Sequence, residues 1–155
     1  NFKKAMENIV DLGLKEILDE QVIDKKKPLF GICLGFQLLS KYSEEGNHAG
    51  LGWVDGTVKK FSFNKVNSHK VPHVGWKTIK ILKEDSIFRN IKQSQRFYFT
   101  HSYHMVCDSS DSLSTTEYGY EFVSSVRKEN IVGTQFHPEK SHRMGFEVLK
   151  NFCKY

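Results

Sequence analysis

Gly31-Ile-Cys-Leu-Gly-Phe-Gln-Leu-Leu39 places one cysteine between two glycines, where an apolar, strand-like run meets a helix-compatible run. This layout is typical of a nucleophile elbow, a strained strand-to-helix turn that exposes a reactive side chain. The flanking residues are small there because the strand and the helix pack closely. The stretch therefore predicts a strand, a tight turn and a helix, with Cys33 as a candidate nucleophile.

Alternating helical and strand patterns extend outward from this turn, which indicates an α/β fold. Apolar residues at helical spacing predict a helix over residues 1 to about 19. The expected strands are 29–32, 53–61, 78–82, 97–100, 121–126 and 131–136, with a loop at 64–70. Helical patterns are also expected at 36–42 and 145–152.

Composition favours a single globular domain over residues 1–155, since 39% of the residues are hydrophobic. No apolar run reaches the ~18 residues of a membrane span, and no secretion signal opens the chain, so we expect a cytoplasmic protein without a membrane partner. Cys33, Cys107 and Cys153 are far apart and odd in number, which predicts reduced thiols. The net charge of +5 comes from scattered lysines that do not form a nucleic-acid module.

A second group of reactive residues lies in Gly133-Thr-Gln-Phe-His-Pro-Glu139. His137 follows an apolar strand end, and Glu139 stands two residues later, so both side chains can point the same way from an extended backbone. With Cys33 they supply the residue types of a nucleophile, a general acid/base and an orienting acid. The sequence thus predicts a cysteine-dependent triad.

The elbow and Gln135-Phe-His-Pro-Glu-Lys-Ser141 together resemble the two signatures of class I (triad) glutamine amidotransferase domains. Within that class, Val71-Pro-His-Val-Gly-Trp76 and Phe97-Tyr-Phe-Thr-His-Ser-Tyr103 are similar to the glutaminase subunits of imidazole glycerol phosphate synthases. The resemblance implies a flavodoxin-like fold with a mixed, mainly parallel central sheet flanked by helices. It also implies hydrolysis of L-glutamine without a cofactor.

Roles in the reaction follow from the same resemblance. Cys33 would attack glutamine to form a thioester, helped to ionise by His137 and by the helix N-terminus, while Glu139 would fix the tautomer of His137. The backbone N–H of Leu34 would be an oxyanion donor. The expected glutamine pocket consists of Gln37, Glu45, Ser102 and Tyr103, with Glu45 on the α-ammonium and the Ser102-Tyr103 backbone on the carboxylate.

The family passes its ammonia to a separate (β/α)₈-barrel synthase, which in this case would belong to histidine biosynthesis. Trp76 and Lys140 match positions that face this barrel. A paralogous subunit that supplies ammonia to an N-acetyl sugar in surface polysaccharide synthesis shares the same motifs. The partner therefore decides between these two functions.

Other interpretations stay open at the level of the sequence. A binding or regulatory module that has lost catalysis and a stand-alone cysteine hydrolase are both compatible with this architecture. His69 with His73, or His101 with His104, have spacings found in metal sites, but neither pair has a third ligand nearby in the sequence, so we expect no metal. Cys107 and Cys153 are expected to act as small hydrophobic residues.

The first residues suggest that the chain is a fragment. It has no initiator methionine and opens with a helix. An α/β sheet whose elbow comes so early normally has at least one strand before it. The resemblance implies that about fifty residues precede this point in family members. In the family, a glycine-rich loop of that segment supplies the second oxyanion donor. We therefore expect the first strands and this loop to be missing.

Overall fold

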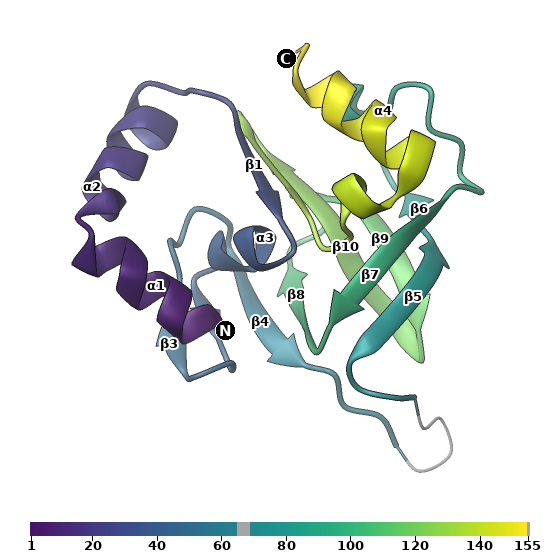
Figure 1. Cartoon of the computed structure of the whole chain (residues 1–155), viewed down its shortest axis with the longest axis horizontal. Coiled ribbons are helices and arrows are strands. Elements are labelled where there is room, and N and C mark those ends of the chain that lie inside the picture. Colours follow the sequence, from purple (N-terminus) through teal and green to yellow (C-terminus); the bar gives the residue numbers. More distant parts are fainter. Residues whose placement is uncertain (65–68, 155) are drawn as a thin grey trace.

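The computed structural model describes residues 1–64 and 69–154 (Figure 1). Its first half contains α1 (Phe2–Asp11), α2 (Leu14–Leu18), the π-helical turn η1 (Asp19–Asp24), β1 (Leu29–Ile32), α3 (Leu34–Leu38), β2 (Tyr42–Ser43), β3 (His48–Ala49), β4 (Gly56–Lys60) and β5 (His73–Thr78). Its second half contains β6 (Lys80–Ile81), η2 (Ser86–Phe88), β7 (Arg96–His101), β8 (Tyr103–Cys107), β9 (Ser112–Tyr118), β10 (Tyr120–Lys128), β11 (Ile131–Thr134), η3 (Pro138–Lys140) and α4 (His142–Phe152).

The central sheet runs in the order β1-β11-β10-β8-β4-β2-β3, and β9 joins it by pairing with β10 and β6. Strands β5 and β7 form a separate antiparallel pair. The expected mixed α/β class is confirmed, but within the described residues parallel pairing is limited to β1–β11 and β2–β4. The sheet is less parallel than predicted because tight turns join β9 to β10 and β10 to β11, and such turns can only bring a strand back antiparallel.

The predicted first helix is interrupted. Helix α1 ends at Asp11, and Gly13 has a left-handed φ of 64° before α2 begins. The chain then forms the π-helical turn η1 up to Asp24. Glycine adopts this backbone conformation without a steric cost, so it divides a pattern that looks continuous in the sequence.

The strands differ from their predicted positions in the middle of the chain. The predicted strand 78–82 is divided between two strands, since Thr78 is the last residue of β5 and Lys80 and Ile81 form the short strand β6. Strands β8 and β9 are absent from the prediction, while β1, β7, β10, β11 and α4 fall where they were expected. The helix predicted at 36–42 ends earlier, because Tyr42 and Ser43 join the sheet. Residues 65–68 of the predicted loop lie outside the described residues.

Two hydrophobic cores lie on opposite sides of the central sheet (Figure 1). One packs α1 and α3 against the sheet through Phe2, Phe36 and Met105. The other packs α4 and the β5–β7 pair through Phe99, Phe136 and other aromatic rings. No helix among the described residues is long and apolar enough to span a bilayer.

Candidate active site

Cys33 occupies a strained turn between β1 and α3. Its φ is 51° and its ψ is −101°, a conformation that residues other than glycine rarely adopt. The Cys33 N–H donates to the carbonyl of Thr134 at 2.8 Å and so extends the β1–β11 ladder. A Cβ at Gly31 would lie 2.8 Å from the backbone of Gly35, which explains why the elbow needs a glycine before its cysteine.

A hollow of about 340 Å³ opens at this turn. Its lining combines the elbow with the β7–β8 turn and with Glu45, and it thus contains six of the residues predicted from the sequence. The residues that line it are Asn1, Cys33, Leu34, Gln37, Glu45, Pro72, Thr100, His101, Ser102 and Tyr103. The fold therefore brings the predicted nucleophile, oxyanion donor and glutamine-binding residues to one cavity.

The backbone of His137, just after β11, is held by hydrogen bonds to both its N–H and its carbonyl. Its N–H donates to the carbonyl of Tyr98 at 2.9 Å, and Ser141 Oγ donates to its carbonyl at 2.6 Å. Ser141 Oγ also accepts from the N–H of Tyr98, so one hydroxyl fastens this loop to β7. The position of the imidazole is thus set by the backbone.

The ring of His137 has one engaged nitrogen and one free nitrogen. Nδ1 lies 2.6 Å from Oε1 of Glu139, whereas Nε2 is buried and has no hydrogen-bond partner among the described residues. A carboxylate beside Nδ1 keeps the proton there and leaves a lone pair on Nε2. Among the same residues, no hydrogen bond joins His137 directly to Cys33.

The sequence led us to expect that the surroundings of the Cys33 sulfur favour the thiolate, but in the structure they favour the thiol. Burial raises the pKa of the Cys33 thiol, the nearby Glu139 carboxylate raises it further, and the Leu34 N–H, Lys140 and Gln135 act in the opposite direction. Helix α3 has only five residues, so its dipole is weak. The resting sulfur is therefore a thiol that needs a base.

All four of the predicted glutamine-binding residues already have hydrogen-bond partners within the fold. Gln37 Nε2 donates to the carbonyl of Tyr103 at 2.9 Å and to Oε1 of Gln135 at 3.0 Å, so both of its amide protons are used. The Ser102 carbonyl accepts from the N–H of Phe61 at 3.0 Å. Glu45, which lines the hollow, accepts through Oε2 from the N–H of Phe2 at 2.8 Å.

The two predicted interface residues lie outside the hollow. Trp76 is on β5, where its ring stacks on His142 at 5.0 Å with an interplanar angle of 8°. Lys140 is exposed at the end of η3. It is close enough to Cys33 for its charge to act on the sulfur.

Two residues of the candidate site were given no role by the sequence, although both lie in the quoted motif. Gln135 is fully buried, and its Nε2 lies 3.7 Å from Cys33 Sγ. Ser141 links His137 to β7. The signal available for both was their place in Gln135-Phe-His-Pro-Glu-Lys-Ser141, but a motif does not say which atoms meet.

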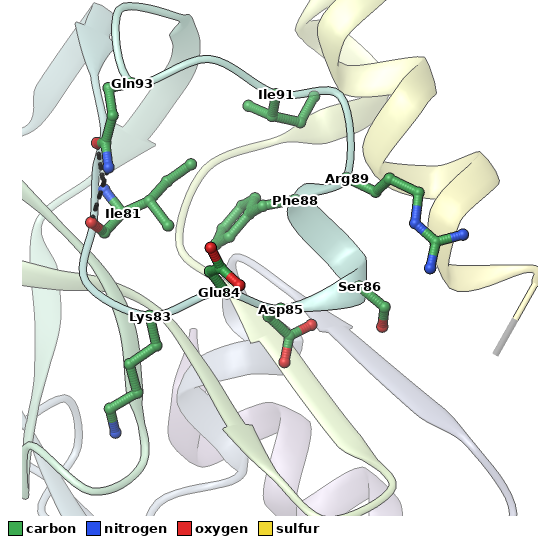
Figure 2. A pocket seen from close by; sticks show the side chains of 9 residues that line it. All are labelled: Ile81, Lys83, Glu84, Asp85, Ser86, Phe88, Arg89, Ile91 and Gln93. Atoms are coloured by element: carbon green, nitrogen blue, oxygen red, sulfur yellow. Dashed lines mark hydrogen bonds between the residues drawn. The ribbon is translucent and has the colours of Figure 1, made fainter.

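Larger hollows exist elsewhere, but no cysteine lines them. One of about 530 Å³ lies around η2, where Gln93 pairs with both backbone groups of Ile81 (Figure 2). Asp85, which also lines it, is bound to Arg127. In the described ranges, no three histidine, cysteine or acidic side chains gather closely enough to hold a metal ion.

A family model for class I glutamine amidotransferases matches residues 7–154. Three relatives are named as HisH subunits of imidazole glycerol phosphate synthase, the second of them as "HisH 2". The protein from Leptospira borgpetersenii is 42% identical over 99% of this chain and 76% of its own length, and that from Methanococcus maripaludis is 45% identical with the same coverage. The protein from Pelagibacter ubique is 47% identical over 98% of this chain and 74% of its own.

Solved structures share the fold at lower identity. A putative GMP synthase component from Thermoplasma acidophilum has a TM-score of 0.65 and 20% identity over 92% of this chain. A glutamine amidotransferase from Thermotoga maritima has a TM-score of 0.63 and 21% identity over 96%. This chain spans 64% and 56% of the lengths of those two proteins.

Proposed function

The chain belongs to the class I glutamine amidotransferase family, and from this premise we propose that it is the glutaminase subunit of an imidazole glycerol phosphate synthase. It hydrolyses L-glutamine to glutamate and ammonia and passes the ammonia to its synthase partner. The observation that carries the proposal is the state of His137, whose Nδ1 is held by Glu139 while its buried Nε2 has no partner among the described residues. A ring with these properties is prepared to accept a proton.

The reaction that we propose begins with a proton transfer. His137 Nε2 takes the proton of the Cys33 thiol, and the sulfur attacks the side-chain amide carbon of glutamine. The tetrahedral intermediate collapses when the same nitrogen protonates the leaving amine, which departs as ammonia and leaves a γ-glutamyl thioester. Water, deprotonated by His137, then attacks the thioester, and glutamate leaves as the proton returns to the sulfur. Glu139 keeps Nδ1 protonated throughout.

The hollow offers groups for each part of the substrate. We assign the Leu34 N–H to the developing oxyanion and Glu45 Oε1 to the α-ammonium group. The carbonyls of Ser102 and Tyr103 are engaged in the fold, so we assign their N–H groups to the α-carboxylate. Gln37 has both amide protons occupied, and only its Oε1 is assigned to the substrate.

The acceptor of the ammonia is a separate protein in this proposal. We propose that residues 1–155 act as one glutaminase domain and dock on a (β/α)₈-barrel synthase through the surface that carries Trp76 and Lys140. Both residues lie beside the candidate triad, Lys140 directly after Glu139 and Trp76 on the strand that pairs with β7. Ammonia released at Cys33 would then enter the partner over a short path.

The first test is the replacement of the nucleophile. Cys33→Ala should lower glutamate release in the presence of the synthase by about 10³-fold or more, because no thioester can form. Cys107→Ala, which changes a thiol on β8, should retain activity. A diazoketone analogue of glutamine should add its mass to the peptide that contains Cys33. Unchanged turnover in Cys33→Ala would exclude the mechanism.

The second test identifies the partner. The chain is offered separately to a histidine-pathway synthase and to a sugar-amidating synthase, and glutamate release is measured with each. Stimulation by the first alone supports the proposed function. Stimulation by the second alone would assign the chain to surface polysaccharide synthesis instead.

A further inference from the structure

A buried line of hydrogen bonds leads from β5 to the sulfur of Cys33. It crosses from the β5–β7 pair to the elbow through side chains that are themselves mostly inaccessible. Its contacts are His73 Nδ1 to His101 Nε2 at 3.0 Å, His101 Nδ1 to the Tyr103 carbonyl at 2.7 Å, Gln37 Nε2 to the same carbonyl at 2.9 Å, Gln37 Nε2 to Gln135 Oε1 at 3.0 Å, and Gln135 Nε2 to Cys33 Sγ at 3.7 Å.

Only one assignment of donors and acceptors satisfies every hydrogen bond in this line. A carbonyl can only accept, so the Tyr103 oxygen requires the amide nitrogen of Gln37 and a protonated Nδ1 of His101. The second proton of Gln37 must then meet the oxygen of Gln135, which turns the nitrogen of Gln135 toward the sulfur. The amide orientation of Gln135 is thus imposed by its neighbours.

The imidazoles at the far end follow the same logic. With its proton on Nδ1, His101 presents Nε2 as an acceptor, so His73 donates from its own Nδ1. Burial lowers the pKa of His101 to about 3 and that of His73 to about 4, so both rings stay neutral near pH 7. A neutral ring keeps this pattern, whereas a charged His101 would lose its acceptor.

Burial makes the arrangement rigid. Gln135 is 0% exposed and Gln37 is 5% exposed. A buried amide that loses its hydrogen bonds destabilises the fold, because water cannot replace them, so rotation of either amide is unfavourable. The Gln135 donor is therefore kept in a fixed place relative to the nucleophile.

The sulfur needs such a donor because its surroundings oppose ionisation. The thiol is partly buried and lies within the influence of the Glu139 carboxylate. The groups that favour the thiolate are the Leu34 N–H, the Lys140 ammonium and the Gln135 amide. Of these, the Leu34 N–H is also the donor assigned to the oxyanion, so it becomes occupied during the reaction.

We propose that Gln135 is a further catalytic residue, whose amide holds the Cys33 sulfur while it becomes a thiolate, and that Gln37, His101 and His73 are positioning residues that set the direction of this amide. The inference rests on the proposed glutaminase function. The Gln135 amide would remain a hydrogen-bond donor to the sulfur when the Leu34 N–H binds the oxyanion.

The test reads the sulfur directly. Wild-type protein and the similarly sized variants Gln135→Met and Gln135→Glu are treated with iodoacetamide between pH 6 and 10, and modification of the Cys33 peptide is followed by mass spectrometry. Loss of the donor should raise the apparent pKa by about one unit, which lowers the alkylation rate at neutral pH about tenfold. Gln135→Glu should lower the rate further, since a carboxylate would face the sulfur.

Two controls separate this effect from general damage. Asn151→Leu replaces another buried amide, which bonds the carbonyls of Ile87 and Arg89 far from the site, and it should leave the Cys33 profile unchanged. The exposed Cys153 is alkylated in the same samples and reports whether the chain as a whole has become more open. Both Gln135 variants are compared by their unfolding midpoints in urea, so that only folded protein is scored.

Glutamate release with the synthase completes the test. The inference predicts that Gln135→Met lowers kcat about tenfold and leaves KM within about twofold, because the donor acts on the nucleophile and not on bound glutamine. Alkylation profiles equal to wild type in both folded Gln135 variants would overturn it. If the profiles shift but wild-type protein releases no glutamate with any synthase, the proposed function fails while the role of Gln135 at the sulfur stands.

Discussion

At the scale of single residues, Cys33 combines a strained backbone with a thiol that stays protonated at rest. Its φ of 51° exposes the sulfur to the hollow, and burial raises its pKa. A thiol is far less reactive than a thiolate toward oxidants and electrophiles. In the proposed mechanism the sulfur is therefore protected until His137 removes its proton, which would place most of the control of reactivity on the imidazole.

Glu139 should matter through that imidazole. In Glu139→Gln the amide can offer its oxygen or its nitrogen to Nδ1, and without the carboxylate charge the proton can move to Nε2, where it blocks the base. We expect kcat to fall about 10²–10⁴-fold with little change in KM, because Glu139 does not line the hollow. The measurement is steady-state glutamate release with the synthase.

A surface acid provides the matched control for this change. Glu147 lies on α4, where it accepts a hydrogen bond from Asn90, and Glu147→Gln should keep normal turnover. A kcat of Glu139→Gln within about twofold of wild type would show that the Nδ1 contact is not needed in catalysis.

The sequence predicted the chemical types at the site but not their connections. Cys33, His137 and Glu139 stand in motifs whose residue types indicate a triad. The structure places Cys33 directly after β1, and His137 and Glu139 on the segment that follows β11, the strand that pairs with β1. The tie between Gln37 and Gln135 joins residues on separate elements, and its direction depends on which amide atom meets a carbonyl. A linear pattern contains no information on that orientation.

At the scale of elements, the elbow depends on the contact between β1 and α3. Gly31 leaves space for the backbone of Gly35, and Gly133 on the neighbouring strand leaves space for the ring of Phe36. Side chains at Gly31 or Gly133 would push the helix away from the sheet and displace Cys33. The glycines thus position Cys33 through the space that they leave for the helix.

The two glycines of the elbow should therefore respond differently to the same substitution. In Gly31→Ala the new methyl group would lie 2.8 Å from backbone atoms, which should cost about 1–3 kcal/mol of unfolding free energy. In Gly35→Ala the methyl group meets nothing within 4 Å outside its own helix in the described part of the chain, and alanine favours a helix by about 0.5–1 kcal/mol. Urea unfolding midpoints measure both changes. Equal midpoints for the two variants would contradict this account of the elbow.

Elements were predictable where apolar residues form a continuous run and not where polar residues are buried. Strand β11 has four buried positions in a row and was found from its apolar run. Strand β9 buries Ser112 and Ser114, and the Ser114 hydroxyl lies 2.9 Å from that of Ser124 on β10. Buried serines that satisfy one another resemble a surface loop in the sequence, so the tertiary pairing and not the local pattern defines this strand.

At the scale of the whole molecule, the second core is rich in histidine as well as phenylalanine. Phe61 lies at its centre, with ring centroids 6.3 Å from His73, 5.2 Å from His101 and 4.7 Å from His104. Burial lowers the pKa of all three imidazoles, to about 4 for His73 and about 3 for His101. The core that supports the β7–β8 wall of the hollow is therefore built for neutral rings.

This core should make the fold sensitive to mild acid. In the unfolded chain a histidine binds its proton near pH 6.5, whereas His73 and His101 stay neutral in the fold until about pH 4 and 3. The unfolded state thus holds more protons below pH 6.5, and stability falls as pH falls, with a slope that approaches about 1.4 kcal/mol per pH unit for each such ring. Urea unfolding at steps from pH 7.5 to 5 measures this slope.

Two variants test the origin of the slope. His73→Phe keeps an aromatic ring against Phe99 and Tyr118 and should reduce the slope by the contribution of about one proton. His48→Gln on the short edge strand β3 should leave the slope close to that of wild type. A slope in His73→Phe equal to that of wild type would mean that His73 is protonated in the folded core and that the buried line toward Cys33 does not depend on its neutrality.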